Sequence, residues 1–340
     1  MQFSSLFPSF IRLLLVSGLF LTSGAHAEQK PVLTIYTYDS FSSEWGPGPK
    51  IEAGFESICE CDLKFIAVDS STGILSRVLL EGESAQADIV LGLDNSLLTT
   101  ARETGLIAPH QVDIAALDLP INWQDADFLP FDFGYFAFIF NTETLANPPS
   151  SFEELIEMDE QIKIVIQDPR TSTPGLGLLL WVKSVYGDRA ADFWRRLKPR
   201  ILTVTQGWSE AYGMFVEGEA DMVLSYTTSP AYHMIAEQAF AYQAAGFESG
   251  HGMQIEVAAV LKNAPNPALA HQFMDYIVSN DFQSIIPTGN WMYPVTRLEQ
   301  GLPAEFDQLV QPSQSLLIDS DDIAQNKKAW IAEFNQALAN

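Results

Sequence analysis

The sequence predicts an α/β protein of two lobes with a ligand cleft between them, each lobe a mixed, mostly parallel sheet flanked by helices. Strand-like and helix-like segments alternate along the chain, which is typical of parallel sheets covered by helices on both faces. Two long β-prone runs, 131–140 and 253–261, divide these segments into two groups. The chain has 340 residues, which is long for a single hydrophobic core and sufficient for two lobes.

The first 27 residues have the features of a signal peptide. Arg12 is the only charge before an apolar run over 13–21, and Ala25-His26-Ala27 fits an A-x-A cleavage site. The run is short for a membrane span, so a membrane anchor is the weaker alternative. We therefore expect an exported chain that is cleaved after Ala27, is not embedded in the membrane, and folds without residues 1–27.

The first lobe is predicted from three strands with helices between them. Strands are expected at 32–38, 63–68 and 87–93, and helices at 50–57 and 73–81. Ligands of such sheets collect beyond the carboxyl ends of the strands. Asp39, Asp69 and Asp94 each follow one of the expected strands, so we expect them at one edge of the sheet.

The second lobe follows the run FDFGYFAFIF at 131–140, which predicts a strand that leaves the first lobe. Within it we expect strands at 163–167, 201–204 and 222–225, and helices at 175–186, 188–197 and 208–217. The strand at 253–261 returns to the first lobe, and a helix follows at 266–279. The expected division is 28–133 plus 254–282 for the first lobe, and 134–253 plus 283–340 for the second. This is the architecture of a hinge-closing receptor.

Composition excludes several classes of function. The chain has 18 Lys and Arg against 43 Asp and Glu, for a net charge of −25, so it is unsuited to nucleic acid and mildly favours cationic ligands. No G-x-S-x-G, Walker A or H-E-x-x-H motif is present. The five histidines are isolated, so we expect no metal, no cofactor and no catalytic residue. Cys59 and Cys61 can form a disulfide in an oxidising compartment, with a small stabilisation because the loop is short.

A polar segment, QDPRTSTPGLG at 167–177, predicts a helix start. Pro174 suits the first turn of a helix, with Ser172 or Thr173 as the N-cap. Free amides and hydroxyls at such a start can hold an anion such as a phosphate. The alternative is that Ser172 and Thr173 only cap the helix, as most Ser and Thr residues at helix starts do.

Aromatic side chains form the second candidate feature. They lie in loops after predicted strands, where they would line a cleft: Tyr38, Trp45, Trp208, Tyr212, Tyr226, Tyr232, Trp291 and Tyr293. Trp and Tyr faces hold a flat cationic ring by stacking and cation–π attraction, at about 0.5–2 kcal/mol per contact. Glu256 stands alone among apolar residues of a strand, so it faces either the cleft or water at an edge.

These segments resemble a known family. TYTYDSF, ADIVLGLDN, QDPRTSTPGLGLLLW, GWSEAYG, LSYTTSPAYH and IPTGNWMYPV are similar, in order and spacing, to the thiamine-binding proteins of bacterial ABC importers. The resemblance implies the type II periplasmic-binding-protein-like fold and a periplasmic location. It implies thiamine, thiamine monophosphate and thiamine diphosphate as ligands, and a membrane permease and ATPase as partners. It implies ligand contacts from Tyr38, Trp45, Ser172, Thr173, Trp208, Tyr226, Thr227, Thr228, Ser229, Pro230, Tyr232 and Trp291.

The chain departs from the family at Ser70 and Ser71, where the family usually has Asp-Gly. Either Asp69 replaces the missing carboxylate at the ligand, or Ser70 makes a weaker bond. The cysteine pair is itself a family trait, which favours a structural Cys59–Cys61 bond. Two alternatives differ in function: a receptor of the same fold for a polyamine or ferric ion, and an enzyme resembling thiaminase I. Ferric sites usually use paired tyrosines, which Tyr226 and Tyr232 would supply; the enzyme needs a reactive cysteine.

Overall fold

One continuous mixed sheet organises the computed structural model, which describes residues 30–339. Its strand order is β2-β1-β3-β10-β5-β8-β6-β7. The strands are β1 Val32–Tyr38, β2 Asp62–Val68, β3 Ile89–Asp94, β4 Ile107–Ala108, β5 Leu129–Asn141, β6 Ile164–Gln167, β7 Ile201–Thr205, β8 Met222–Tyr226, β9 Tyr242–Ala244, β10 His251–Leu261, β11 Tyr293–Pro294 and β12 Ser315–Leu316. The expected signal peptide and its cleavage site lie outside the described residues.

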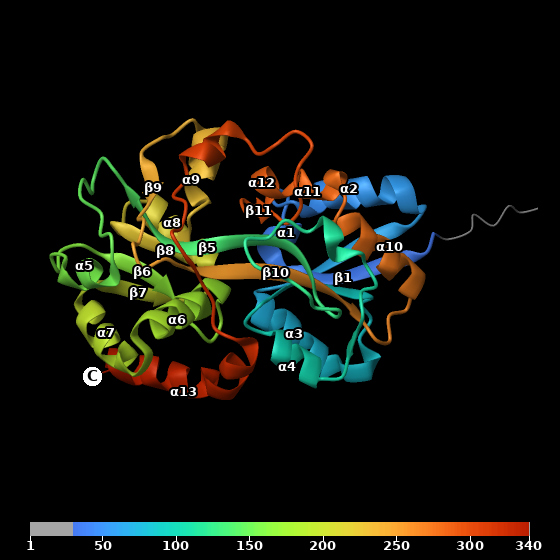
Figure 1. Cartoon of the computed structure of the whole chain (residues 1–340), viewed down its shortest axis with the longest axis horizontal. Helices are drawn as coiled ribbons and strands as arrows, with labels where there is room; N and C mark the ends of the chain where they lie inside the picture. The colour runs from blue at the N-terminus through green and yellow to red at the C-terminus, as the bar shows by residue number, and fades with distance from the viewer. Residues whose placement is uncertain (1–29, 340) are drawn as a thin grey trace, which may run out of the picture. The chain divides into compact units, whose positions relative to one another are not determined.

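Helices cover both faces of this sheet (Figure 1). They are α1 Asp39–Ser42, α2 Gly48–Cys59, α3 Ser71–Glu81, α4 Leu98–Glu103, α5 Phe152–Glu157, α6 Thr173–Tyr186, α7 Ala190–Leu197, α8 Trp208–Val216, α9 Ser229–Tyr232, α10 Pro267–Ile277, α11 Asn280–Gln283, α12 Ile286–Gly289 and α13 Ser320–Ala339. The segments expected from sequence in both lobes occur within a few residues of these bounds. The fold is therefore the two-lobed α/β architecture that the alternating pattern predicted.

Two long strands connect the lobes. β5 and β10 run antiparallel side by side across the middle of the sheet (Figure 1). At one end β10 pairs with β3 of the first lobe, and at the other end β5 pairs with β8 of the second. Every residue of β10 is buried, as expected for a strand covered on both faces. A change in the angle between the lobes must therefore bend these two strands.

Each lobe has its own packed interior. In the first, Phe55 and Phe273 meet edge to face, with ring centres 5.0 Å apart, in a cluster shared by α2 and α10. In the second, Trp181 of α6 packs against Phe152 at 4.6 Å. Such aromatic pairs contribute about 0.5–1.5 kcal/mol beyond their buried area. Each of these two aromatic clusters lies on one side of the connecting strands, while a third cluster contains residues of both lobes, such as Ile74 and Met234.

The chain after residue 282 does not belong to the second lobe alone, which differs from the expected division. Ile286 and Met292 pack in the first lobe's cluster, and β11 pairs with the first-lobe end of β5. Phe334 of α13 packs in the second lobe, while the Thr99 hydroxyl of α4 donates to Asp321 at 2.6 Å. The helix α13 therefore touches both lobes, because its apolar and polar faces have partners in different lobes.

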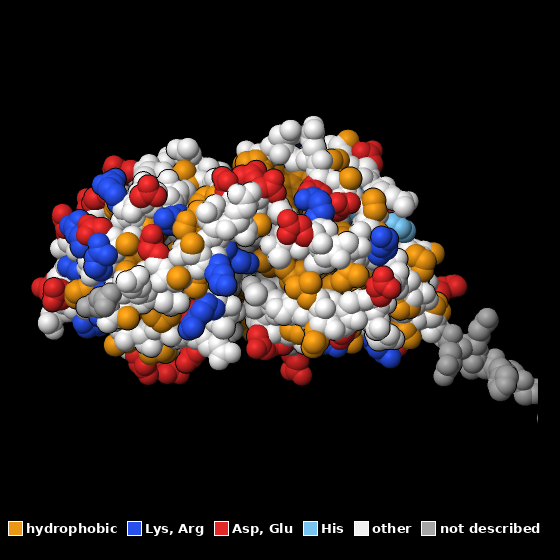
Figure 2. Space-filling view, turned by 90° about the horizontal axis from the view of Figure 1, so that it is seen from below, with side chains coloured by type: hydrophobic (Ala, Val, Ile, Leu, Met, Phe, Trp, Pro, Cys, Tyr) orange, Lys and Arg blue, Asp and Glu red, His pale blue; other side chains and the backbone are white. Residues whose placement is uncertain are grey.

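The surface is acidic but mixed: acidic, basic and apolar side chains are interspersed on the face seen from below in Figure 2. Cys59 and Cys61 form a disulfide at the end of α2, where Glu60 takes a left-handed conformation with φ 53°. Within residues 30–339 we find no helix that is long and apolar enough to cross a membrane.

Candidate functional site

A large cavity of ≈ 1490 Å³ lies between the two lobes beside the hinge strands. It exceeds the 300–1,000 Å³ of typical small-ligand sites, so it has room for an organic solute with attached groups and water. Its lining includes eleven of the fourteen expected ligand-binding residues: Tyr38, Trp45, Ser70, Ser71, Ser172, Thr173, Trp208, Tyr226, Ser229, Tyr232 and Trp291. The fold brings together residues as distant in sequence as Tyr38 and Trp291.

Two helix starts meet at one end of the cavity. Ser172 is the N-cap of α6 and Ser70 is the N-cap of α3, where its hydroxyl accepts a hydrogen bond from the amide of Gly73 at 3.2 Å. The hydroxyl of Thr173 donates across the cleft to that of Ser71 at 3.0 Å. Helix starts carry free N–H groups and partial positive charge. The paired starts therefore offer donors from both lobes to an anion, and we call this part of the cavity the anion-binding end.

The side chain of Ser172 is available for a ligand. It is 4 % exposed, and its hydroxyl has no partner in the described chain. A buried unpaired hydroxyl costs about 1–3 kcal/mol, which a bound acceptor would recover. Gly175 in the first turn allows the close approach of α6 to the preceding strand, since a Cβ there would lie 2.5 Å from the carbonyl oxygen of Gln167.

Arg170 adds a positive charge near this end. It is the one Lys or Arg among the described residues that line the cavity. Its guanidinium holds Asp168 through two nitrogens, at 2.9 and 2.5 Å, and this bond lowers the pKa of Asp168. The pairing fixes Arg170 at the loop before α6, where it can also face an anion.

Aromatic side chains form the walls. Trp208 stacks on Tyr212 with ring centres 5.0 Å apart, and its ring nitrogen donates to Ser225 at 2.8 Å. Tyr232, also in the second lobe, meets Trp291 edge to face at 5.3 Å. Trp45 is 60 % exposed, so it stands at the mouth. These rings provide faces for a flat, electron-poor ligand.

Part of the predicted site lies behind the wall. Thr227 and Thr228 are 0 % exposed, and Pro230 is buried. None of the three lines the cavity, because the turn after β8 is tied into the sheet by the bond from the Thr227 amide to the carbonyl of Tyr135 at 2.8 Å. The neighbouring residues Tyr226, Ser229 and Tyr232 line the cavity instead.

Two carboxyl groups, those of Glu256 and Asp132, lie at the floor of the cavity, and only Glu256 was considered from the sequence. Glu256 lines the cavity, and its Oε2 accepts a hydrogen bond from the hydroxyl of Tyr38 at 2.6 Å. Asp132 is its direct partner on β5. The amide nitrogen of Asn290 lies 2.6 Å from Asp132 Oδ2, 2.9 Å from Tyr38 Oη and 3.4 Å from Glu256 Oε2. Asp132 and Asn290 were not foreseen, although Asp132, like Glu256, is a lone acid in an apolar strand.

Burial changes the acidity of this floor. It raises the pKa of Asp132 to about 7. Burial, and then the adjacent charge of Asp132, raises the pKa of Glu256 well above its ordinary value. Desolvation also raises the pKa of Tyr38. Two close carboxylates in a desolvated site cannot both ionise easily, so the pair retains a proton near neutral pH.

The chain departs from the family's Asp-Gly at Ser70 and Ser71, and both residues considered as a substitute for the aspartate lie at the cavity. Asp69 and Ser70 line it, with Asp69 exposed and Ser70 occupied in capping α3. The carboxylate of Asp69 is thus free to meet a ligand, while the hydroxyl of Ser70 already accepts the Gly73 amide.

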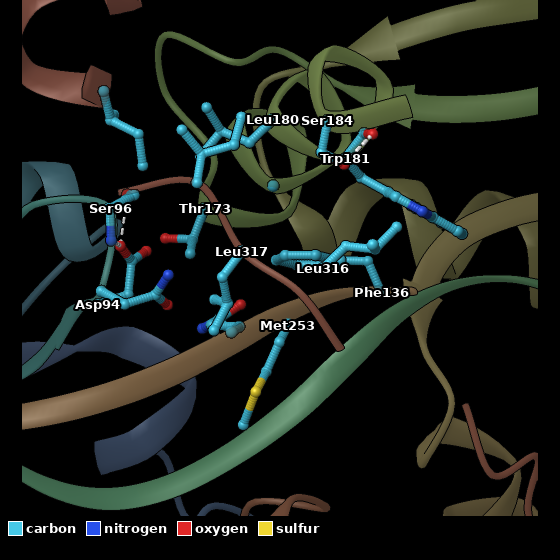
Figure 3. A pocket seen from close by; sticks show the side chains of 16 residues that line it. Asp94, Ser96, Phe136, Thr173, Leu180, Trp181, Ser184, Met253, Leu316 and Leu317 are labelled. Atoms are coloured by element: carbon cyan, nitrogen blue, oxygen red, sulfur yellow. Dashed lines mark hydrogen bonds between the residues drawn. The ribbon is translucent and has the colours of Figure 1, made fainter. Parts of the chain in front are cut away.

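A second cavity lies behind the anion-binding end, at the other side of α6. It measures ≈ 20 Å³ and is lined by Asp94, Ser96, Leu316 and Thr173 among others (Figure 3). This is space for about one water, so it does not compete as a solute site. Among residues 30–339 no group of three or more His, Cys, Asp or Glu side chains is placed to hold a metal ion.

The chain that carries this site is similar to known proteins over most of its length. The profile of the family described as "Bacterial extracellular solute-binding protein" matches residues 50–284. The chain is 50% identical to the "Thiamine-binding periplasmic protein" of Escherichia coli, over 91% of this chain and 94% of that protein. It is 49% identical to the protein of the same name from Salmonella typhimurium, over 94% and 98%.

Solved structures of solute-binding proteins have the same fold as this chain. The fold matches a "Periplasmic thiamin binding protein" with a TM-score of 0.89 at 50% identity, over 92% of this chain and 97% of that one. An apo ferric ion-binding protein A from Pasteurella haemolytica matches with a TM-score of 0.74 at 17% identity, over 90% and 97%. The second likeness shows the fold alone.

Proposed function

We propose that this chain, which belongs to the family of bacterial extracellular solute-binding proteins, is the periplasmic thiamine receptor of an ABC importer. The observation that carries the proposal is the cavity between the lobes, which combines aromatic walls, an acidic floor and paired helix starts at one end. Thiamine has a flat cationic ring at one end of a two-ring molecule, and its phosphate esters add an anion. The relatives at half identity are thiamine-binding periplasmic proteins.

The rings of the ligand lie among the aromatic side chains. Trp208 and Tyr212 offer a stacked pair, and Tyr232 with Trp291 an edge-to-face pair. Each face contributes about 0.5–2 kcal/mol to a cationic ring in a desolvated site. The acid pair on the floor, of which Glu256 lines the cavity, offers carboxylate oxygens to the cation.

The phosphate of the two esters lies against the starts of α3 and α6. Ser172 supplies an unpartnered hydroxyl, Thr173 and Ser71 supply hydroxyls from opposite lobes, and Arg170 supplies charge. Donors from both lobes on one phosphate would hold the lobes closed, because opening would break charge-assisted hydrogen bonds. Thiamine, thiamine monophosphate and thiamine diphosphate are therefore all ligands.

Delivery to a membrane permease with its ATPase follows from lobe closure. The lobes are joined by β5 and β10, so ligand contacts made by both lobes shift the protein to a closed form. The closed form is the one that the permease would distinguish from the empty receptor.

The alternatives have less support. Tyr226, one of the two tyrosines that would mimic a ferric site, donates its hydroxyl to Gln254 at 2.8 Å. The ferric ion-binding structure shares only the fold. A polyamine could bind at the acidic floor, but it has no anionic group for the anion-binding end. For a thiaminase I-like enzyme, both cysteines of the chain are held in the disulfide, so no thiol is left as a nucleophile and we infer a receptor without catalytic activity.

Calorimetry of the mature protein with thiamine tests the proposal. We expect one site per chain and competition by both phosphate esters. X-ray scattering should show a smaller radius of gyration when thiamine is bound. Absence of heat together with absence of displacement at micromolar protein would exclude thiamine as the ligand.

A further inference from the structure

Two acids face each other at the centre of the hinge. Asp132 of β5 and Glu256 of β10 are direct partners in the antiparallel ladder, where opposed Cβ atoms are about 4.5–5.5 Å apart. The pairing of these strands changes register between Glu256 and Val257. Bulges of this kind redirect side chains next to functional sites. Asp132 is 0 % and Glu256 6 % exposed, and only Glu256 reaches the cavity.

The partners of this acid pair are neutral. Glu256 Oε1 accepts from the amide of Gln254 at 2.9 Å, and Oε2 accepts from the hydroxyl of Tyr38 at 2.6 Å. Asp132 Oδ2 accepts from Asn290, whereas its Oδ1 is buried without a partner in the described chain. A buried carboxylate pair without a compensating cation is strongly disfavoured.

We infer that Asp132 and Glu256 form a proton-holding acid pair under the cavity, which gives up a proton when a permanently cationic ring occupies the site above Glu256. The inference rests on the proposed function for the identity of the cation. It adds that capture is an exchange: a ring cation enters, and a proton leaves to solvent. No bond is made or broken other than that of the proton to a carboxylate oxygen.

The electrostatics support the exchange. Burial raises the pKa of both acids, that of Asp132 to about 7, and the proton belongs to the pair rather than to either residue. A cation a few ångströms away favours the ionised form and lowers the pKa of the pair. The ring cation has no proton to give, so we assign the exchanged proton to the acid pair.

The other groups around the pair do not replace it as the proton source. Asp94 faces Glu256 from β3, and burial raises its pKa too, against the opposing effects of Ser96 and then Lys327. Asp94 does not line the large cavity, so it is not the acid that meets the ring. Tyr38 and Tyr226 have pKa values raised well above 10, so they stay neutral at physiological pH. The groups that face the pair are Tyr38 on β1, Asp94 on β3, Tyr226 on β8, Gln254 on β10 and Asn290 after α12.

Linkage gives the sign and size of the effect. Below the pKa of the free pair, binding must remove a proton, so affinity for thiamine falls as pH falls. With the pKa of Asp132 at about 7 in the free protein and the proton lost from the complex throughout this range, affinity rises about tenfold from pH 6 to pH 8 and then levels off.

The test is calorimetry with thiamine in HEPES and in Tris at pH 7, two phosphate-free buffers whose heats of ionisation differ. The difference in measured heat between the buffers gives the number of protons released. We expect wild type to release about half a proton or more per thiamine bound. Asp132→Asn/Glu256→Gln should release almost none and show a flat affinity from pH 6 to 8. Glu52→Gln is the matched control, a carboxyl on α2 with a raised pKa outside the cavity, and it should release as many protons as wild type.

A neutral analogue with the thiazolium replaced by an uncharged ring should bind wild type without proton release. The aminopyrimidine of thiamine also titrates, but it is the same in every experiment. Its contribution therefore drops out when the proton release of wild type and variants is compared. Wild type binding thiamine without proton exchange would overturn the inference while leaving the proposed function intact, as would undiminished release from the double variant. If the double variant does not melt cooperatively, Glu256→Gln alone should still lower the release. Wild type that does not bind thiamine at all would overturn the proposed function itself.

Discussion

The two ends of the cavity are built in different ways. The anion-binding end uses residues that are adjacent in sequence, such as Ser172 and Thr173, placed at a helix start by local rules. The acidic floor uses Asp132 and Glu256, which meet only because β5 and β10 pair in one register. The anion-binding end would select a phosphate through its free hydrogen-bond donors. The floor would select the cationic ring through buried carboxyl groups. The phosphate and the ring are therefore recognised by separate parts of the cavity.

The largest expected effect is at the anion-binding end. Ser172→Ala/Thr173→Ala removes two hydroxyl donors and leaves the backbone amides. Each lost hydrogen bond to a charged group costs about 1.5–3 kcal/mol, so both phosphate esters should weaken at least tenfold. Thiamine itself should change much less. Titration of all three ligands by calorimetry measures this.

Ser184→Ala is the matched control, a hydroxyl near the other end of α6 that donates to the carbonyl of Trp181. It should leave all three affinities unchanged. Because loss of a cap destabilises a helix by about 1 kcal/mol, the melting of each variant must be checked. Equal weakening of thiamine and its esters in a well-folded variant would show that the phosphate binds elsewhere.

Removal of an aromatic wall should act on all ligands alike. Trp208→Ala deletes a ring face worth about 0.5–2 kcal/mol, so thiamine and both esters should each weaken by about two- to thirtyfold. The ratio of their affinities should stay constant, which fluorescence competition can measure. A change confined to the esters would contradict the division between the two ends.

The acidic floor should make stability depend on pH. Because the folded pKa of Asp132 is raised from its ordinary value near 4 to about 7, its contribution is fully present below pH 4 and is lost as pH rises through 7. Asp132→Asn/Glu256→Gln removes this dependence. The Tm of the variant relative to wild type should therefore be higher at pH 8 than at pH 5, by about 3 °C or more. A constant difference at both pH values would argue against a buried proton.

The smallest effect is expected from the disulfide. Cys59–Cys61 closes a very short loop at the end of α2, so its reduction should cost about 1–2 kcal/mol of stability. Thiamine affinity should be unchanged, since neither cysteine lines the cavity. Thermal melts and titrations with and without reductant test both statements. A loss of binding on reduction would connect α2 to the site.

The same contrast explains what the sequence predicted. The start of α6 was found because Ser172, Thr173 and Pro174 signal a cap in three consecutive residues. Asp132 was not found as the partner of Glu256, because strand register depends on the whole sheet rather than on local pattern. Thr227 and Thr228 were placed at the ligand, but a turn's residues face either way and this turn is bonded to β5. The helix α13 was not predicted, although its buried residues Ile323, Phe334 and Ala337 recur at helical spacing.

A crystal structure of the mature protein with thiamine diphosphate tests the central claim most directly. The account predicts the diphosphate between the starts of α3 and α6, with oxygens within hydrogen-bond distance of Ser172, Thr173 and Ser71. It predicts the cationic ring between the aromatic walls and above Glu256. A ligand bound in the reverse direction, with its phosphates at the floor or its ring at the helix starts, would contradict the account.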